Sequence, residues 1–559
     1  MPLRKEKSDD RVLVFPGWAH RKYTHGFIPG EENQFTVEVY VSGYAAQFSR
    51  PEYATRAQRG LLYAAKNLAA LPKLIKQAVK QAEPDPPPPI AIHLTPSTEE
   101  LLATKKLPPR PTEITDELER VALSQMYDDD TATQYSQDST ASSSAASAPE
   151  ELDLAMAGLS QDEVRQLHLN LHSRFRQFWS SSLASRMVRI ELYVVGEPAE
   201  PLLTQDVMTD AQGGFALQLQ VPWERMLAHP LAQKIAHGEA GATSLSVDFI
   251  RVTAELLPAP SKSLTATLIN GAASTPTSAT FAESSMPPSR SNSSDELHRP
   301  MDSCVLPLTY TRVRLISDID DTVKRSNILG GAKKAFRNVF VNELKDVIIQ
   351  EMSDWYQSMY SSGVRFHYVS NSPWELLPII TEFMQVSKLP EGSLRLKWYG
   401  GVRHLFQSGL LEPADVRKRT GVVEVLDAFL DSQFILVGDS GEKDMELYAS
   451  LAADRPFQIL AVFIRDVTTP TLVAKIAAKS AVKEPPAATA KDADASSSSS
   501  PQLSKKTQSV SGPLYDFAER VRRAREQTPA HIAFRLFTHP SECIEAERIL
   551  EAVGALDRH

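Results

Sequence analysis

The sequence has little of several features that would assign it to a class. It contains two cysteines in 559 residues, Cys304 and Cys543. They offer neither the C-x-x-C spacing of a metal site nor a disulfide framework. No run of about 18 apolar residues occurs, so no bilayer-spanning helix is expected. The N-terminal sequence MPLRKEKSDDR lacks the apolar segment of a secretory signal. We therefore expect a soluble protein of the cytoplasm.

Positive charge is also in short supply. Lys and Arg number 60 against 69 Asp and Glu, which gives a formal net charge of −9. Proteins that bind nucleic acid generally rely on a basic face that displaces counterions from phosphates. The acidic balance therefore argues against nucleic acid as a partner.

Large apolar side chains are scarce in three long segments. Residues 127–155 contain ASSSAASA, residues 257–303 contain PPSRSNSS, and residues 476–512 contain DASSSSS. Segments of this composition cannot offset chain entropy by burial, so we predict disordered linkers. The roughly 450 residues that remain are enough for two substantial hydrophobic cores.

Residues 1–126 and 156–256 show the period-two alternation of β-strands. In TVEVYVSGY the three valines share one face, and GGFALQLQV and LSVDFIRV repeat the pattern. Several such strands joined by Gly-containing turns indicate an antiparallel sheet or a sandwich. We expect a β-rich, sandwich-like N-terminal region, and no catalytic constellation is visible in it.

Two helices are expected within this N-terminal half. Residues 52–82 have an amphipathic pattern that Pro72 should interrupt. Its polar side carries four lysines: Lys66, Lys73, Lys76 and Lys80. That face either lies on an anionic membrane or is the solvated side of a helix packed on its own domain. Ser160-Gln-Asp-Glu163 is a capping box that should begin the second helix.

Residues 304–475 have a different pattern. The short apolar segments VRLIS, FHYVS, LRLKW, FILVG and ILAVFI alternate with helical segments. Such a pattern indicates an α/β domain whose parallel sheet is covered on both faces. Sites in these domains lie at the carboxyl ends of the strands. Residues 513–559 add a helix, the strand-like IAFRLF and another helix, and should dock near this domain.

Polar side chains follow three of these strands. DIDDT begins with Asp318 and Asp320, which share one side of an extended segment. FHYVS ends at Ser370, and FILVG leads into GDSGEKD, which holds Asp439 and Asp444. Because the carboxyl ends of parallel strands meet at one edge, these groups should lie close together.

The chemistry of this set is that of phosphoryl transfer. Gathered carboxylates repel one another unless a cation is present, and oxygen ligands without His or Cys select a hard ion such as Mg²⁺. A carboxylate beside the ion can attack phosphorus to give an aspartyl-phosphate. A second carboxylate can protonate the leaving oxygen and then activate water. A hydroxyl and a lysine ammonium would hold the phosphoryl oxygens.

The motifs carry a family resemblance. DIDDT, YVSNS, Lys418 and GDSGEKD resemble, in order, the four motifs of the haloacid dehalogenase-like phosphatase superfamily. LISDIDDTVKRSNI, HYVSNSPWELLP and LVGDSGEKDMELY are more narrowly similar to the fungal actin-patch-associated phosphatidate phosphatase family. The resemblance implies Mg²⁺-dependent conversion of phosphatidate to diacylglycerol by a protein peripheral to membranes at cortical actin patches.

The resemblance also implies a role for each matching residue. The catalytic set would be Asp318 as nucleophile, Asp320 as acid and base, Thr322 as support of their loop, and Ser370 and Lys418 as phosphoryl-binding groups. The metal set would be Asp318, Asp320 through its carbonyl, Asp439 and Asp444. The lysine stays open between Lys418 and Lys397, at the end of LRLKW.

Two alternatives remain beside this interpretation. One is a phosphatase for another lipid phosphate or for phosphoproteins, and the other is an interaction scaffold with a vestigial site. Trp374, Trp398 and Tyr399 either contact lipid or pack on the sheet. KKLPPRP, at Lys105–Pro111, matches a basic polyproline ligand for SH3 domains of endocytic or actin proteins, with a plain linker as the alternative.

Overall fold

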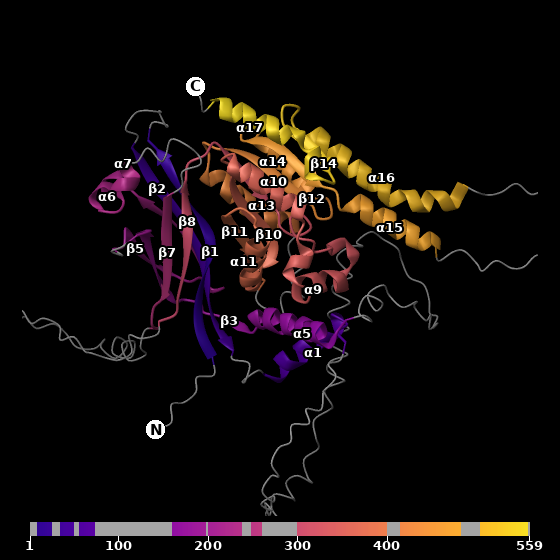
Figure 1. Cartoon of the computed structure of the whole chain (residues 1–559), viewed down its shortest axis with the longest axis horizontal. Coiled ribbons are helices and arrows are strands. Elements are labelled where there is room, and N and C mark those ends of the chain that lie inside the picture. The colour runs from indigo at the N-terminus through magenta and orange to yellow at the C-terminus, as the bar shows by residue number, and fades with distance from the viewer. Residues whose placement is uncertain are drawn as a thin grey trace, which may run out of the picture.

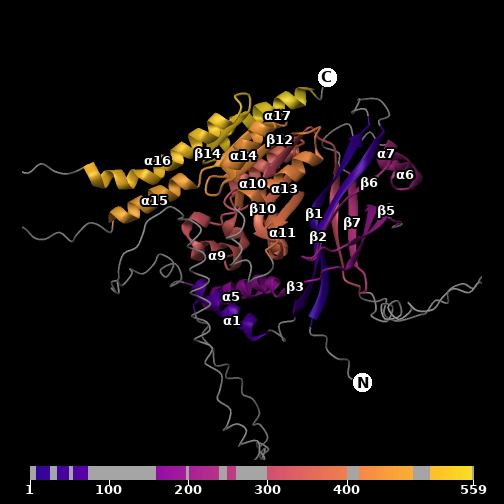
Figure 2. The same ribbon diagram turned by 180° about the vertical axis from the view of Figure 1, so that it is seen from behind.

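The computed structural model describes residues 8–24, 34–49, 55–72, 159–196, 200–237, 248–259, 299–399, 414–481 and 504–556. They form two sheets side by side, with most of the helices around the second sheet (Figure 1). The view from behind shows the same division (Figure 2). The segments Lys105–Pro111 and 127–155 lie outside the described residues, so the SH3 ligand and this linker stay predictions.

The first sheet has eight strands and is mainly antiparallel. Its strands are β1 (Ser8–Tyr23), β2 (Phe35–Ser49), β3 (Ser180–Ser182), β4 (Met187–Val194), β5 (Leu203–Met208), β6 (Gly214–Val221), β7 (Asp248–Leu256) and β8 (Met301–Thr309). The order is β3-β2-β1-β8-β7-β4-β5, and β6 pairs with β2. Only β1 and β8 run parallel among these pairs. The pairing describes a single sheet, and the sandwich-like arrangement stays a prediction.

The core of this sheet follows the predicted alternation. Val37, Val39 and Val41 are all buried, as are the inward positions of β4 and β7. Strand β8 begins within the predicted linker 257–303 and pairs with β7 along its length. The chain up to Thr309 therefore completes the first sheet, and the second sheet begins at Val313.

The predicted helices of this half are present with shorter bounds. Helix α1 spans Arg56–Leu68 and ends ahead of Pro72, and Lys73 and the later lysines lie outside the described residues. Helix α5 (Gln161–Phe175) begins at Ser160, whose hydroxyl accepts the Glu163 N–H at 3.2 Å. The Glu163 carboxylate accepts the Ser160 N–H at 2.7 Å, which confirms the capping box. Two short helices, α6 (Trp223–Ala228) and α7 (Gln233–His237), follow β6.

The second sheet has six strands and is parallel throughout. They are β9 (Val313–Ser317), β10 (Arg365–Pro373), β11 (Gly392–Lys397), β12 (Gln433–Asp439), β13 (Ile459–Arg465) and β14 (Ala533–Phe537). The order is β11-β10-β9-β12-β13-β14, with every pair parallel. This confirms the predicted parallel sheet, and β14 adds the C-terminal segment to its edge. The direction of winding reverses at β9, where such sheets place their sites.

Helices cover both faces of this sheet. They are α9 (Ala332–Phe340), α10 (Gln350–Ser361), α11 (Leu377–Val386), α13 (Ala414–Ala428), α14 (Asp444–Asp454), α15 (Thr468–Ala481), α16 (Ser504–Gln527) and α17 (Ile544–Leu556). Short 3-10 turns lie at η5 (Ile328–Gly330), η6 (Leu344–Val347) and η7 (Trp374–Leu376). Helices α10 and α11 contribute to one core, and α13, α14 and α16 to another. The ends of α15 and α16 also shorten the linker predicted over 476–512.

The two sheets pack directly on each other. Trp18 of β1 stacks on Tyr40 of β2 with ring centroids 4.4 Å apart, and both join the core built by α13. The Tyr40 hydroxyl donates to Glu424 of α13 at 3.1 Å. No described helix is both long and apolar enough to cross a membrane.

Candidate active site

Asp318 stands at the carboxyl end of β9, in the middle of the parallel sheet. Its backbone N–H donates to the Val437 carbonyl of β12 at 2.9 Å, which fixes the residue between the two strands. Its carboxylate is buried, and each oxygen has a donor. Lys418 Nζ lies 2.6 Å from Oδ1, and the Thr322 hydroxyl donates to Oδ2 at 3.2 Å. Thr322 thus supports the predicted nucleophile directly.

Asp320 is held by a different set of donors. Lys324 Nζ lies 3.3 Å from Oδ1, which also accepts the Ser326 hydroxyl. The hydroxyls of Ser370 and Ser372 reach Oδ2 at 3.3 and 2.9 Å. Burial by itself would raise the pKa of Asp320, but Lys324 and the hydroxyl donors lower that pKa below its ordinary value. The side chain is therefore held as an oriented carboxylate.

Lys418 of α13 lies between two carboxylates. Its Nζ is 2.6 Å from Asp318 and 2.5 Å from Asp444, and the Glu442 carboxylate lies 3.9 Å away. Burial would lower the pKa of Lys418, but the surrounding carboxylates raise it well above the ordinary value. The neighbouring Arg419 turns away and pairs with Asp454. These contacts put Lys418 beside Asp318 and Asp444, and the choice of Lys418 over Lys397 as the phosphoryl-binding lysine stays a prediction.

Asp318, Asp439 and Asp444 form a compact carboxylate cluster. One oxygen from each lies within 4.8 Å of the others. Asp439 Oδ1 accepts the N–H groups of Gly441 and Glu442 at 2.6 and 3.1 Å. The second oxygens of Asp439 and Asp444 are buried and accept no hydrogen bond from a described residue. Burial, with the neighbouring carboxylates, raises the pKa values of Asp318 and Asp439 well above their ordinary range.

This cluster fits a hard divalent cation. Buried carboxylate oxygens without a donor are costly, and a metal ion is one way to satisfy them. All three side chains offer oxygen only, which suits Mg²⁺ rather than a softer ion. Asp320 directs its carboxylate to the serines and Lys324, so its predicted share in the metal site, through the backbone carbonyl, stays a prediction.

The sequence interpretation missed several polar residues of the site. They are Lys324, Ser326, Ser372, Asn371 and Glu442, which contact Asp320, Lys418 or one another. Lys324 reaches Asp320 because the chain reverses at Asp321, whose φ is +56°. The Asp321 carboxylate accepts the N–H groups of Asn327 and Ile328 at 2.6 and 2.8 Å and holds this turn. The segment VKRSN directly after DIDDT was the available signal for Lys324 and Ser326.

Some aromatic side chains near the site pack against the protein, and one is partly exposed to solvent. Trp374 packs on Phe15 and Tyr44 of the first sheet, with ring centroids 5.8 and 5.6 Å apart, and its N–H donates to Leu396. The Tyr399 hydroxyl donates to the Asn371 carbonyl at 2.7 Å. Trp398 remains 37% exposed. Residues 400–413, between Tyr399 and α13, lie outside the described residues.

Comparisons with known proteins bear on the same segment. Residues 313–466 match the family described as phosphatidate phosphatase APP1, catalytic domain. An uncharacterized Schizosaccharomyces pombe protein is 35% identical over 179 residues, which is 32% of this chain and 29% of that protein. Phosphatidate phosphatase APP1 of Saccharomyces cerevisiae is 38% identical over 154 residues, 27% of this chain and 26% of that enzyme. The matches thus span under a third of each relative.

One solved structure shows only a weak likeness to this chain. It is a β-glucuronidase of Bifidobacterium dentium bound to a coumarin glucuronide, at 8% identity and a TM-score of 0.17. The alignment covers 63% of this chain and 54% of that one. All seven predicted site residues, by contrast, lie within the matched segment 313–466.

Proposed function

We propose that this protein hydrolyses phosphatidate to diacylglycerol and inorganic phosphate. The proposal is supported by the match of residues 313–466 to the catalytic-domain family of phosphatidate phosphatase APP1. The single observation that carries the proposal is the buried contact of Lys418 with both Asp318 and Asp444 at the carboxyl edge of the sheet. The parallel sheet and the placement of these carboxylates support a haloacid dehalogenase-like domain.

The first half-reaction would use Asp318 and Asp320. A carboxylate oxygen of Asp318 attacks phosphorus, and the bond from phosphorus to the glycerol oxygen breaks. Asp320, which is held as a carboxylate and therefore has to take up a proton before this step, gives that proton to the glycerol oxygen, which leaves as the diacylglycerol hydroxyl. Lys418 and the Ser370 hydroxyl stabilise the charge on the phosphoryl oxygens. The products are diacylglycerol and an aspartyl-phosphate at Asp318.

The second half-reaction would restore the enzyme. Asp320, now a carboxylate, takes a proton from a water molecule as that water attacks phosphorus. The bond between phosphorus and the Asp318 oxygen breaks, and phosphate leaves. Lys324 and the serines around Asp320 favour its ionised form, which is the form this step requires. Thr322 keeps the Asp318 carboxylate in line through its hydrogen bond to Oδ2.

The carboxylate cluster would hold the cation of this reaction. Asp318, Asp439 and Asp444 supply its side-chain ligands, and the Asp320 carbonyl a further one. Mg²⁺ bound there would offset the negative charge shared by the phosphoryl group and Asp318. Asp439 is positioned for this role by the two N–H groups that fix its other oxygen.

Membrane contact and cellular location are part of the proposal. A phosphatidate phosphatase has to meet its substrate at a bilayer surface, and Trp398 is an exposed aromatic side chain next to the site. The resemblance adds cortical actin patches and SH3-domain partners. Vesicle sedimentation should show binding that rises with anionic lipid, and absence of that dependence would remove the membrane part.

The substrate is tested by comparing phosphate release from several phosphomonoesters. The full chain is assayed with Mg²⁺ against phosphatidate, lysophosphatidate, diacylglycerol pyrophosphate and phosphopeptides, the lipids in mixed micelles. We expect the highest kcat/KM on phosphatidate, and loss of release from every substrate in Asp320→Asn. Preference for a phosphopeptide would replace the lipid assignment, and release from no substrate would favour the vestigial scaffold.

A further inference from the structure

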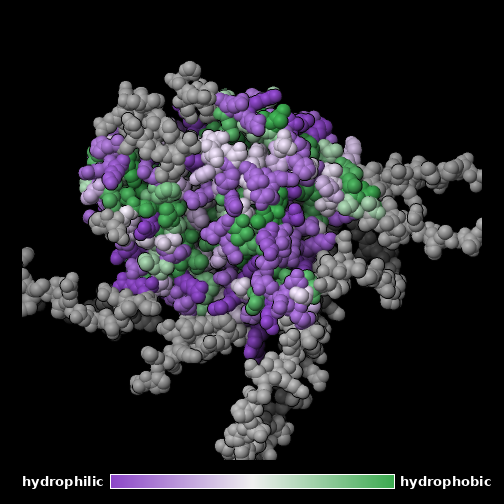
Figure 3. Space-filling model, in the orientation of Figure 1, coloured by the Kyte–Doolittle hydropathy of each residue, from purple (hydrophilic) through white to green (hydrophobic). Residues whose placement is uncertain are grey.

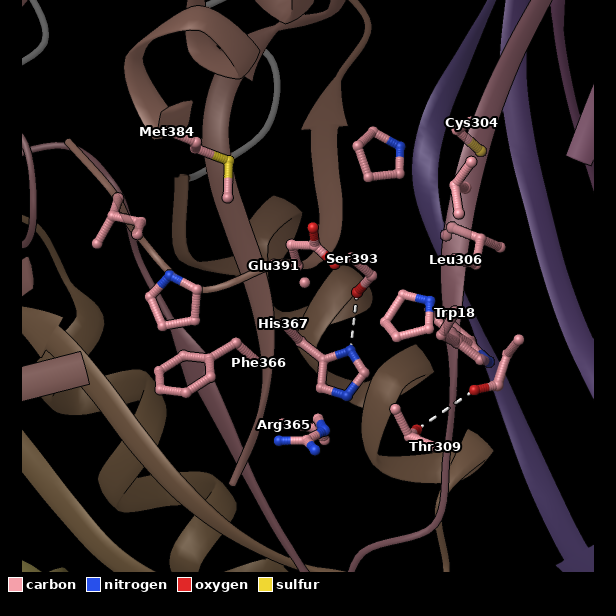
Figure 4. A pocket seen from close by; sticks show the side chains of 18 of the residues that line it. Trp18, Cys304, Leu306, Thr309, Arg365, Phe366, His367, Met384, Glu391 and Ser393 are labelled. Carbon is pink, nitrogen blue, oxygen red and sulfur yellow. Dashed lines mark hydrogen bonds between the residues drawn. The ribbon is translucent and has the colours of Figure 1, made fainter. Parts of the chain in front are cut away.

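A cavity lies between the two sheets, away from the carboxylate cluster. It has a volume of about 530 Å³ and is bordered by β1 and β8 on one side and by β10, α11 and the start of β11 on the other. Figure 4 shows Trp18, Cys304 and Leu306 across from Met384, Phe366 and His367. The volume falls in the range of cavities that bind small molecules.

Two arginines stand side by side in the floor of this cavity. Arg314 of β9 and Arg365 of β10 are direct partners in the strand register, so both side chains leave the same face of the sheet. Both are buried and both line the cavity. Like charges opposite each other destabilise a sheet. Burial, together with the repulsion from Arg365, lowers the pKa of Arg314 to about 9. Arg365 donates to the backbone carbonyls of Tyr360 and Val364 at 3.3 and 3.2 Å, so Arg314 is the member of the pair whose charge needs a compensating group.

The described residues offer Arg314 little compensation. Its hydrogen bonds go to the Ser432 hydroxyl at 3.2 Å, to His367 Nε2 at 3.4 Å and to the Thr309 hydroxyl at 3.5 Å. The last two are at the limit for a hydrogen bond. Its guanidinium carbon lies 3.5 Å from the centre of the Phe429 ring. Among the described residues no carboxylate forms an ion pair with Arg314, although buried charges are normally paired.

His367 contacts the Arg314 guanidinium but does not supply a negative charge to it. A guanidinium only donates, so His367 Nε2 accepts from Arg314 and Nδ1 carries the hydrogen toward the Ser393 hydroxyl at 2.7 Å. Burial, with Arg314 and Arg395 nearby, lowers the pKa of His367 well below its ordinary value. The ring therefore stays neutral, and it fixes the orientation of the guanidinium.

The walls above this floor are apolar. Leu306, Phe366 and Leu389 are buried along the cavity, and Met384 of α11 is half-buried against it. Lys388 and Glu391 are exposed at its border. Val305 of β8 is 52% exposed. Hydrophobic side chains are also visible on the part of the surface that the first sheet occupies (Figure 3). A small inorganic anion would fill neither this volume nor these walls.

We propose that this cavity binds an amphiphilic anion, with a carboxylate or phosphate head at Arg314 and Arg365 and a single hydrocarbon chain along Leu306 and the α11 wall. The planar guanidinium matches either head with two parallel hydrogen bonds. The head would supply the missing negative charge, and the chain would cover the apolar wall. Free fatty acids and single-chain phosphate lipids share this chemistry.

Titration calorimetry on the full chain tests the proposal with four probes that separate head from chain. Dodecanoate and dodecyl phosphate, kept below their aggregation concentrations, carry both parts. Inorganic phosphate carries only a head, and dodecan-1-ol only a chain. We expect saturable binding of one or both charged amphiphiles at one site per chain, and at least about tenfold weaker binding of the two single-part probes. The tighter of the two amphiphiles identifies the head.

Two variants and one control locate the binding site. Arg314→Met removes the charge at similar volume, and Met384→Trp fills the cavity without changing its charge. Each should weaken amphiphile binding at least about tenfold, whereas Arg523→Met, the same change at an exposed arginine of α16, should not. Circular dichroism and cooperative unfolding verify folding, and Met384→Trp decides the matter if Arg314→Met does not fold.

Three results would overturn the proposal. They are absence of saturable binding of both amphiphiles, full binding in folded Arg314→Met and Met384→Trp, and equal affinity for inorganic phosphate or dodecan-1-ol. None of these readings depends on phosphatase turnover, so failure here leaves the assignment of the carboxylate cluster unaffected.

Discussion

Replacement of Lys418 by Met is the most informative perturbation of the carboxylate cluster. Lys418 is 1% exposed, and its ammonium is the cation nearest to both Asp318 and Asp444. Met has a similar length and no charge. The substitution therefore removes the electrostatic partner while leaving most of the packing of α13 in place.

The magnitude follows from what remains behind. Breaking a buried ion pair from one side costs about 3–5 kcal/mol because an uncompensated charge stays buried. Here two carboxylates, Asp318 and Asp444, lose their donor at 2.6 and 2.5 Å. We expect a loss at the upper end, about 4–5 kcal/mol without metal. Part of the cost would be avoided by protonation of a carboxylate, so the loss should shrink as the pH falls.

Urea unfolding in EDTA measures this loss, followed by circular dichroism. Lys443→Met is the matched control, because Lys443 is an exposed lysine in the same GDSGEKD loop and should change stability by less than about 0.5 kcal/mol. The double variant Lys418→Met, Asp444→Asn should regain part of the stability, since one carboxylate fewer is left unpaired. Phosphate release should stay at least about 100-fold below wild type in both Lys418 variants.

A small effect would refute the reasoning. If Lys418→Met destabilises the fold no more than Lys443→Met does, the ammonium is not the counter-charge of the cluster. If the double variant is less stable than Lys418→Met, the cost does not arise from an unpaired carboxylate. Addition of Mg²⁺ to Lys418→Met should restore some stability, and no change would contradict the cation site.

Three further predictions concern other parts of the chain. Lys324→Met should raise the pKa of Asp320, so the acidic limb of the kcat–pH profile should move to higher pH. If the limb does not move, Lys324 does not act on the ionisation of Asp320. Burial, with Arg314 and Lys22 nearby, lowers the pKa of His20 from 6.5 to about 3, so His20 binds a proton only in the unfolded chain between these values. Folding stability should fall as the pH drops through this window, by up to about 1.4 kcal/mol per unit, and His20→Gln should flatten that slope in urea titrations. Ser160→Ala should cost about 1 kcal/mol of stability through loss of the helix cap, measured by thermal unfolding, and no loss would mean that the cap is not formed.

Much of the second sheet could be predicted because apolar strands and polar strand ends are local signals. The apolar segments VRLIS and FILVG predict buried strands. A parallel pairing of these strands then places Asp318 and Asp439 at the same carboxyl edge of the sheet. The contacts of Lys418 were harder to predict from the sequence, because they depend on how α13 crosses the sheet. In the structure Lys418 Nζ contacts Asp318, whereas the Arg419 guanidinium contacts Asp454.

Other features depend on contacts between distant segments and could not be predicted. Lys324 meets Asp320 only because of the left-handed turn at Asp321. Strand β8 joins the first sheet through pairing with β7, across the long segment that separates them in the sequence. The arginine pair was equally hidden, because Arg314 and Arg365 become neighbours only when β9 and β10 align.

Phosphate release from phosphatidate in mixed micelles tests the proposed activity most directly. Wild-type protein and Asp318→Asn are measured side by side with Mg²⁺ and with EDTA, after circular dichroism has shown that both are folded. We expect rapid release by the wild type only with Mg²⁺, and a loss of at least about 1,000-fold in Asp318→Asn. Release by Asp318→Asn at the wild-type rate, or none by the wild type, would contradict the assignment.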